Sequence, residues 1–199
     1  MPLKAGDYPP TKREIVMHIE IPEPSLVILI GTSSAGKSTF ARKHFLATEI
    51  VSSDYCRAML TDDETDQTVT KDAFELLHTI VAKRLKRRRL TVVDATNVQP
   101  AARRKLIAIA QPQNVDSVAI VFDLPEKVVS ERHAARTDSD FGAHVISKQR
   151  LELSRSIQGL KDEGIRVVHI LGQVGDVNAA TVGRAINGGT VGSDSFFDF

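Results

Sequence analysis

The segment Gly31–Ser38 limits the folds open to this chain more than any other. It reads GTSSAGKS, matches the pattern G-x-x-x-x-G-K-[ST], and directly follows the apolar run Leu26–Ile30 (LVILI). A continuous apolar run ended by glycine predicts a strand buried on both faces, as in a parallel sheet. A helix is expected next, over Gly36–Leu46. Backbone N–H groups in such a glycine-containing loop turn inward toward phosphate oxygens, and the helix N-terminus adds its positive end. The sequence therefore predicts a phosphate-binding loop between a strand and a helix.

The residue types of this loop predict its contacts. Lys37 is expected to reach the β- and γ-phosphates of ATP or another NTP, and the Ser38 hydroxyl to ligate Mg²⁺. The expected nucleotide contacts are Gly31, Thr32, Ser33, Ser34, Ala35, Gly36, Lys37, Ser38 and Thr39. GTPases, ATPase motors and kinases all use such loops, so the loop does not choose an acceptor.

Apolar periodicity places the remaining elements. Strands are expected at Val16–Ile21 (a short edge strand), Glu49–Ser52, Leu90–Asp94, Val118–Phe122 and Val167–Leu171, and helices at Asp54–Leu60, Thr70–Arg88, Pro100–Ala110, Glu126–Ala135 and Ala143–Leu160. Strands that alternate with helices predict an α/β fold. We expect a three-layer sandwich of the P-loop NTPase type, with a mostly parallel central sheet of about five strands and a helical lid. A chain of 199 residues fits one such domain. We assign it to residues 21–186, between a flexible lead-in at 1–20 and a Gly/Ser-rich tail or linker at 187–199.

Composition narrows the class of protein. A single cysteine, Cys56, excludes an internal disulfide framework and a four-cysteine zinc site. The chain has no apolar run long enough for a membrane span, and its first residues lack the apolar centre of a secretory signal. We therefore expect a cytoplasmic protein without a membrane partner. The 26 basic residues are matched by 25 acidic ones, which favours local contact with the end of a nucleic acid over binding along its length.

Asp54 and Arg57 form the candidate acceptor side. They stand at i and i+3 on one helical face, just after the second expected strand, where α/β proteins gather their active sites. The carboxylate can orient an attacking hydroxyl and accept its proton, and the guanidinium can hold a substrate phosphate. A helix-stabilising surface pair is the alternative. Asp94, at the end of a buried strand, is the less certain metal candidate, because Asp94 and Asn97 can equally stabilise the turn below the cleft.

The chain has two groups of cations, a spaced pair of arginines near residue 134 and a basic run at 83–89. Arg132 and Arg136 lie at i and i+4, so both can face the nucleotide phosphates from one helix, with a flexible break at 137–142 suited to a lid. A solvated helix face would show the same spacing. Lys83–Arg89 (KRLKRRR) precedes the third buried strand, so we expect it to be a solvated helix end that lies away from the cleft.

Several blocks together carry a family resemblance. The P-loop, VSSDYCR, DDETDQ, VVDATN and ERHAARTD resemble the kinase domain of bacterial polynucleotide kinase-phosphatase, an RNA end-repair enzyme, and more distantly the phage polynucleotide 5′-kinase. The likeness runs from about Pro22 to Leu171. It implies transfer of the γ-phosphate of an NTP to the 5′-OH end of RNA or DNA.

The resemblance also implies residue roles. Asp54 becomes the general base and Arg57 an acceptor-phosphate contact, while Arg132 and Arg136 join Lys37 on the NTP phosphates. The family enzyme also has phosphatase and ligase-like nucleotidyl-transferase modules, for which 199 residues leave no room, so the chain is either the kinase part or a free-standing relative. Two other readings stay open: a P-loop kinase for a small-molecule hydroxyl, and an NTP-dependent binding module without transfer chemistry.

Overall fold

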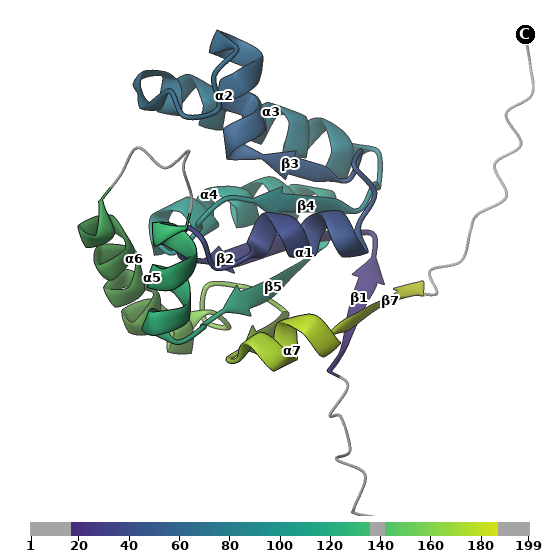
Figure 1. Ribbon diagram of the computed structural model, residues 1–199. Helices are drawn as coiled ribbons and strands as arrows, with labels where there is room; N and C mark the ends of the chain where they lie inside the picture. Colours follow the sequence, from purple (N-terminus) through teal and green to yellow (C-terminus); the bar gives the residue numbers. More distant parts are fainter. Residues whose placement is uncertain (1–16, 136–141, 187–199) are drawn as a thin grey trace, which may run out of the picture.

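A five-stranded parallel sheet forms the centre of the molecule. The computed structural model describes residues 17–135 and 142–186. The strands, in spatial order, are β3 (Ile50–Ser52), β4 (Thr91–Asp94), β2 (Ser25–Gly31), β5 (Asp116–Phe122) and β6 (Val167–Leu171) (Figure 1). All neighbouring pairs are parallel. The predicted α/β fold with a parallel sheet is confirmed.

Helices cover both faces of this sheet, which explains the unbroken apolar runs of the strands. Leu26, Ile28 and Ile30 of β2 pack on one face, and Val27 and Leu29 pack on the other. The first face is covered by α3 (Thr70–Lys86), α4 (Pro100–Ala110) and α6 (Ala143–Ser156), and the second by α1 (Lys37–His44) and α7 (Val174–Ala179). The architecture is the expected three-layer sandwich.

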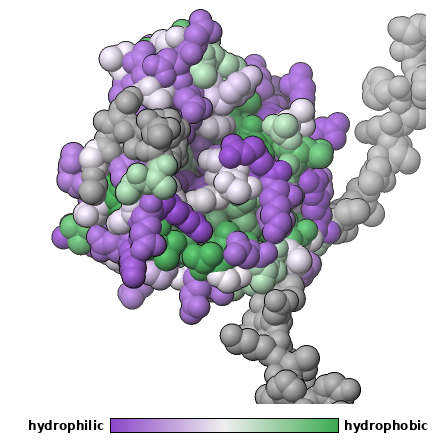
Figure 2. All heavy atoms as spheres, in the orientation of Figure 1, coloured by the Kyte–Doolittle hydropathy of each residue, from purple (hydrophilic) through white to green (hydrophobic). Residues whose placement is uncertain are grey.

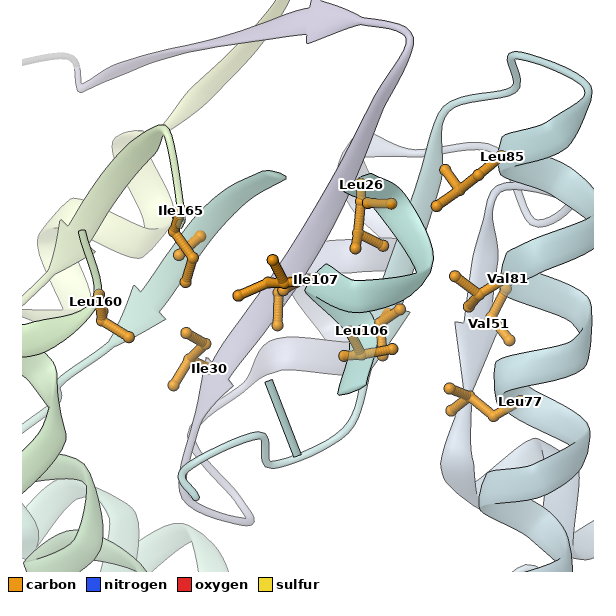
Figure 3. Packing of buried hydrophobic residues seen from close by; sticks show 14 of the residues in the cluster. Leu26, Ile30, Val51, Leu77, Val81, Leu85, Leu106, Ile107, Leu160 and Ile165 are labelled. Carbon is orange, nitrogen blue, oxygen red and sulfur yellow. The ribbon is translucent and has the colours of Figure 1, made fainter. Parts of the chain in front are cut away.

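Helix α3 lies along the edge of the sheet. Its Leu77, Val81 and Leu85 point from the helix toward the sheet, with Val51 of β3 beside Val81 (Figure 3), and all three side chains are fully buried. Full burial of each such side chain is worth about 1.5–3 kcal/mol. This packing fixes the direction of α3, whose N-terminal half reaches the functional cleft.

A second, smaller sheet corrects the expected N-terminal boundary. β1 (His18–Glu23) pairs in parallel with β7 (Thr181–Ile186), and Ile19 and Ile21 are fully buried in the core beneath α1. β1 overlaps the edge strand expected at Val16–Ile21, and it begins at His18, inside the segment 1–20 that was assigned to the lead-in. Neither α7 nor β7 was predicted. The tail at 187–199 lies outside the described residues.

Three of the remaining elements follow the carboxyl ends of central strands: α2 (Ser53–Thr61), α5 (Glu126–Ala134) and the short 3₁₀ turn Gln67–Val69. Two further 3₁₀ turns, Gln111–Gln113 and Ile157–Gly159, end the helical segments that precede β5 and β6. α2 and the α5–α6 pair flank this edge of the sheet (Figure 1). The face in Figure 2 carries mainly hydrophilic side chains with smaller hydrophobic areas between them. Within residues 17–135 and 142–186, no helix has the length and apolar character needed to cross a membrane.

Candidate functional site: a phosphate-binding cleft

A cavity of about 760 Å³ lies at the carboxyl ends of β2, β3 and β4, where open α/β sheets bind ligands. Its polar lining includes Ser33, Ser34, Gly36, Lys37, Ser38, Thr39, Asp54, Arg57, Asp94, Thr96, Arg132 and Gln149. The cavity thus brings together the loop residues, both candidate carboxylates and one of the two expected lid arginines.

The phosphate-binding loop is held by its own backbone. Gly36 caps α1 with φ of +97°, a left-handed conformation that glycine adopts without strain. A Cβ at this position would lie 3.2 Å from Nη1 of Arg132. Lys37 is buried, and its Nζ donates to the Thr32 carbonyl at 2.7 Å. The Gly31 N–H donates to the Thr96 carbonyl at 2.9 Å, so the loop after β4 supports the start of the phosphate loop.

Asp94 stands at the end of β4, beside the loop. Burial raises the pKa of its carboxyl, while the Lys37 charge and a hydrogen bond with the Ser38 hydroxyl act in the opposite direction. A carboxylate and a hydroxyl are the hard oxygen ligands that Mg²⁺ prefers. No group of three or more His, Cys, Asp or Glu side chains converges in the part of the chain that the structure describes. Mg²⁺ does not need one, because it typically keeps waters and phosphate oxygens as ligands.

Asp54 and Arg57 of α2 line the same cleft. Ser52 caps α2 by accepting the Tyr55 N–H at 3.4 Å, which places Asp54 in the first helical turn. Arg57 Nη1 donates to Asp54 Oδ1 at 2.5 Å. The Arg57 side chain is only 10% exposed, whereas that of Asp54 is 58% exposed.

The burial of Arg57 argues against a plain surface pair. Its Nη1 also lies 3.5 Å from the Glu64 carbonyl oxygen, but its buried Nε has no hydrogen-bond partner. A buried donor without a partner is costly, by about 1–3 kcal/mol. Arg57 lines the cleft beside Asp54, so the positive charge of its guanidinium suits this part of the cleft to an anion.

Two side chains connect the helices α5 and α6 to the phosphate loop. Arg132 Nη1 donates to the Ala35 carbonyl at 3.1 Å, and Gln149 Oε1 accepts the Ser33 N–H at 2.8 Å. Arg136 lies outside the described residues. Gln149 was not predicted, because several polar residues share α6 and periodicity alone does not show which one meets the loop.

Asn97 and Arg103 hold the turn that follows β4, below the cleft. Asn97 has φ of +48°, and its Nδ2 donates to the Leu29 carbonyl at 2.8 Å, so Asn97 has the turn-stabilising role. Arg103, which was not predicted, donates from Nη1 to the carbonyls of Asn97 and Val98, both at 2.8 Å. It also forms a paired contact with Glu163.

Other candidates lie outside the cleft. Cys56 is buried in the core, and burial raises the pKa of its thiol against the opposing effect of Arg57. A protonated, buried thiol is a poor nucleophile. The basic run Lys83–Arg89 does not line the cavity, as expected.

The sequence of this chain matches a known protein family. The sequence profile of AAA_33, described as an AAA domain, matches residues 26–158, which is more than half of the chain. The chain belongs to this family. No curated protein matches the chain.

Several solved structures share the fold of this chain. A chain of the Pnkp1/Rnl/Hen1 RNA repair complex matches with a TM-score of 0.59 and 27% identity, over 69% of this chain and 46% of that one. A protein of the PezAT toxin–antitoxin system of Streptococcus pneumoniae matches with a TM-score of 0.59 and 15% identity, over 78% and 69% of the two chains. Shikimate kinase from Acinetobacter baumannii, solved with shikimate, matches with a TM-score of 0.50 and 16% identity, over 78% and 89%.

The chain spans about half of the matched chain in the RNA repair complex, and the two other likenesses show the fold alone. This AAA_33 chain is a P-loop kinase-type domain, a fold that uses a nucleotide as phosphate donor.

Proposed function

We propose that this protein is a polynucleotide 5′-hydroxyl kinase, which transfers the γ-phosphate of ATP or another NTP to the 5′-OH end of RNA or DNA. The observation that carries the proposal is the pair Asp54 and Arg57, which lines the same cavity as Lys37 and Arg132. A nucleotide-binding module without transfer chemistry has no need of an acceptor-side carboxylate opposite its phosphate loop.

The cleft supplies positioning and charge stabilisation, which are the main needs of phosphoryl transfer. Lys37 and the loop amides hold the donor phosphates, and Arg132 lies where its guanidinium can neutralise the charge that spreads over the γ-phosphate. Ser38 and Asp94 are the residues that would hold Mg²⁺, which offsets phosphate charge when bound.

Asp54 acts on the acceptor. Its carboxylate, fixed by Arg57, orients the attacking hydroxyl and accepts its proton as the new P–O bond forms. Because the transition state is loose, proton loss comes late and an ordinary aspartate is a sufficient base. The Arg57 guanidinium, which lines the cleft beside Asp54, would bind the phosphate that follows the terminal nucleoside.

The exposed position of Asp54 favours a macromolecular acceptor. A small-molecule kinase gains specificity by enclosing its substrate, whereas the Asp54 side chain is 58% exposed at the cleft wall. The likeness to the RNA repair complex at 27% identity and the SSDYCR and VVDATN blocks point the same way. A cytoplasmic location and a link to phosphatase and ligase-like modules belong to this proposal.

The test uses γ-labelled ATP, Mg²⁺ and matched RNA and DNA oligonucleotides bearing 5′-OH or 5′-phosphate, beside a panel of sugars, nucleosides and shikimate. Label on the 5′-OH strands alone supports the proposal. Label on a small alcohol would show that the protein is a small-molecule kinase. Absence of transfer to every acceptor would favour an NTP-dependent binding module.

A conservative substitution tests the role of Asp54. Asp54→Asn keeps the shape and a hydrogen-bond acceptor for Arg57 but removes the base, so the transfer rate should fall by about 10²-fold or more. ATP affinity, measured with a fluorescent analogue, should stay within about twofold, since Asp54 faces the acceptor. Full transfer activity in this variant would contradict the assignment.

A further inference from the structure

A basic groove lies at the far end of α3 from the cleft. Every residue from Lys83 to Arg89 except Leu85 is a lysine or arginine. Lys83, Arg84, Arg87 and Arg89 line a cavity of about 580 Å³ with Thr79 and Ile80. We call this surface the α3 groove.

Protein carboxylates do not neutralise the charge of this groove. Lys83, Lys86, Arg87 and Arg89 make no ion pair among the residues that the structure describes. Glu49 is close enough to act on Arg84 electrostatically, but both of its oxygens are held by Arg184, at 2.9 and 2.7 Å.

The two arginines that do have partners are anchored on neutral groups. Arg84 donates to the Leu90 carbonyl at 2.9 Å; burial lowers its pKa, the Glu49 charge opposes this, and the Arg89 charge adds a smaller lowering effect. Arg88 Nη1 donates to the carbonyls of Gln113 and Asn114 at 3.0 and 3.2 Å. These bonds order the cations without cancelling their charge.

The dipole of helix α3 explains only some of the cations in Lys83–Arg89. Cations in the last turn of a helix interact well with its dipole, which accounts for Lys83, Arg84 and Lys86. Arg87–Arg89 follow the last helical residue, and Arg88 adopts a φ of +55°, which is unfavourable for a residue other than glycine. Crowded like charges on an ordered groove are a binding surface for a polyanion.

We propose that the α3 groove binds the phosphodiester backbone of the acceptor strand at a distance from its 5′ end. This inference rests on the proposed function. Phe74 lines the cleft and Arg87 lines the groove, and the α3 rise of about 1.5 Å per residue separates these positions by roughly 20 Å. At about 3.4 Å per nucleotide, roughly six nucleotides bridge that distance.

The acceptor length gives the main readout. In a triple variant, Lys83→Ala, Arg87→Ala and Arg89→Ala, the KM for a 16-nucleotide 5′-OH RNA should rise by about tenfold or more at low salt, while the KM for a four-nucleotide RNA stays unchanged. Arg84 and Arg88 are left intact because they support the backbone. The matched control removes the same charge from exposed positions outside both cavities, with Lys127→Ala, Arg155→Ala and Lys161→Ala.

A binding measurement separates this inference from the proposed function. Fluorescence anisotropy with a 5′-phosphorylated 16-nucleotide RNA reports binding without transfer. Each lost phosphate contact lowers the slope of log K against log salt by about 0.7 for a single strand, so the triple variant should lose about 2 units of slope. Failure of the proposed function appears as absent transfer to every oligonucleotide.

Other results overturn the groove assignment. It fails if the triple variant keeps the parent slope and length dependence, or if the control variant loses as much. Unchanged RNA binding with lost binding to a poly-glutamate peptide would assign the groove to an acidic protein partner instead.

Discussion

Replacement of Arg103 by methionine should be the most damaging single change outside the cleft. The Arg103 side chain is fully buried, and its guanidinium donates to Asn97, Val98 and Glu163. Methionine fills a similar volume without any donor. The substitution leaves the Glu163 carboxylate without its partner and two backbone carbonyls without their hydrogen bonds.

The expected cost follows from these losses. Removing one partner of a buried ion pair typically costs about 3–5 kcal/mol of unfolding free energy, because the other charge stays buried. For a domain of this size each kcal/mol lowers Tm by about 2–4 °C, so Tm should fall by roughly 10 °C. Adding Glu163→Gln to Arg103→Met should recover part of the loss, since it removes the unpaired charge.

An exposed ion pair in the same molecule is the control. Arg166 donates to Asp116 at 2.7 Å, but the Arg166 side chain is 65% exposed, so Arg166→Met should cost about 1 kcal/mol or less. Urea unfolding followed by circular dichroism measures both variants. Equal losses for Arg103→Met and Arg166→Met would refute the reasoning, because burial would then have no effect.

The other predictions concern the cleft and pH. Gly36→Ala should weaken ATP binding by about tenfold, since alanine at φ of +97° costs about 1–2 kcal/mol and its Cβ meets Arg132; Gly175→Ala, where nothing lies within 4 Å, is the neutral control in the same nucleotide titration. Arg57→Lys should raise the KM for a 5′-OH oligonucleotide by roughly tenfold with little change in the KM for ATP, because lysine loses the fork of donors; a change confined to ATP would move residue 57 to the donor side. Burial and the nearby Lys105 lower the pKa of His78, so the folded protein binds this proton less readily than the unfolded chain, and unfolding free energy should fall as pH drops below about 6.5. His78→Gln should show a smaller loss of Tm between pH 7.5 and pH 5.

Local patterns were enough to predict the central elements and the phosphate loop. The strand at Val167–Leu171 and the helix at Pro100–Ala110 have the expected bounds, because apolar runs and a proline at the first helical position mark them clearly. The signal is weaker for β1, where the expected edge strand Val16–Ile21 overlaps the observed His18–Glu23, and β7 was not predicted at all. Each is stable only through the other and through the core under α1, and a partner more than 100 positions away is not visible in a local window.

Buried polar residues were the least predictable part of the fold. Arg103 sits in a helix rich in cations, and arginines are almost never fully buried unless paired. Its pairing depends on Glu163, which precedes β6 and meets α4 only in the folded chain. The same holds for Gln149, whose contact with Ser33 needs α6 to lie against the phosphate loop.

Asp54 lies in the cleft because of the order of the strands in the sheet, which a local sequence pattern does not show. β3 pairs with β4 in a register that sets Ser52 opposite Asp94, so Asp54, just beyond the strand end, enters the cleft next to the Asp94 carboxylate. Burial raises the pKa of Asp94, and the nearby Asp54 charge adds to this rise. Had β3 paired on the other side of the sheet, the same SSDYCR segment would face away from Lys37. The chain thus separates two carboxylates at neighbouring strand ends, with a buried Asp94 near Ser38 and an exposed Asp54 near Arg57, as the proposed phosphoryl transfer requires of its donor and acceptor sides.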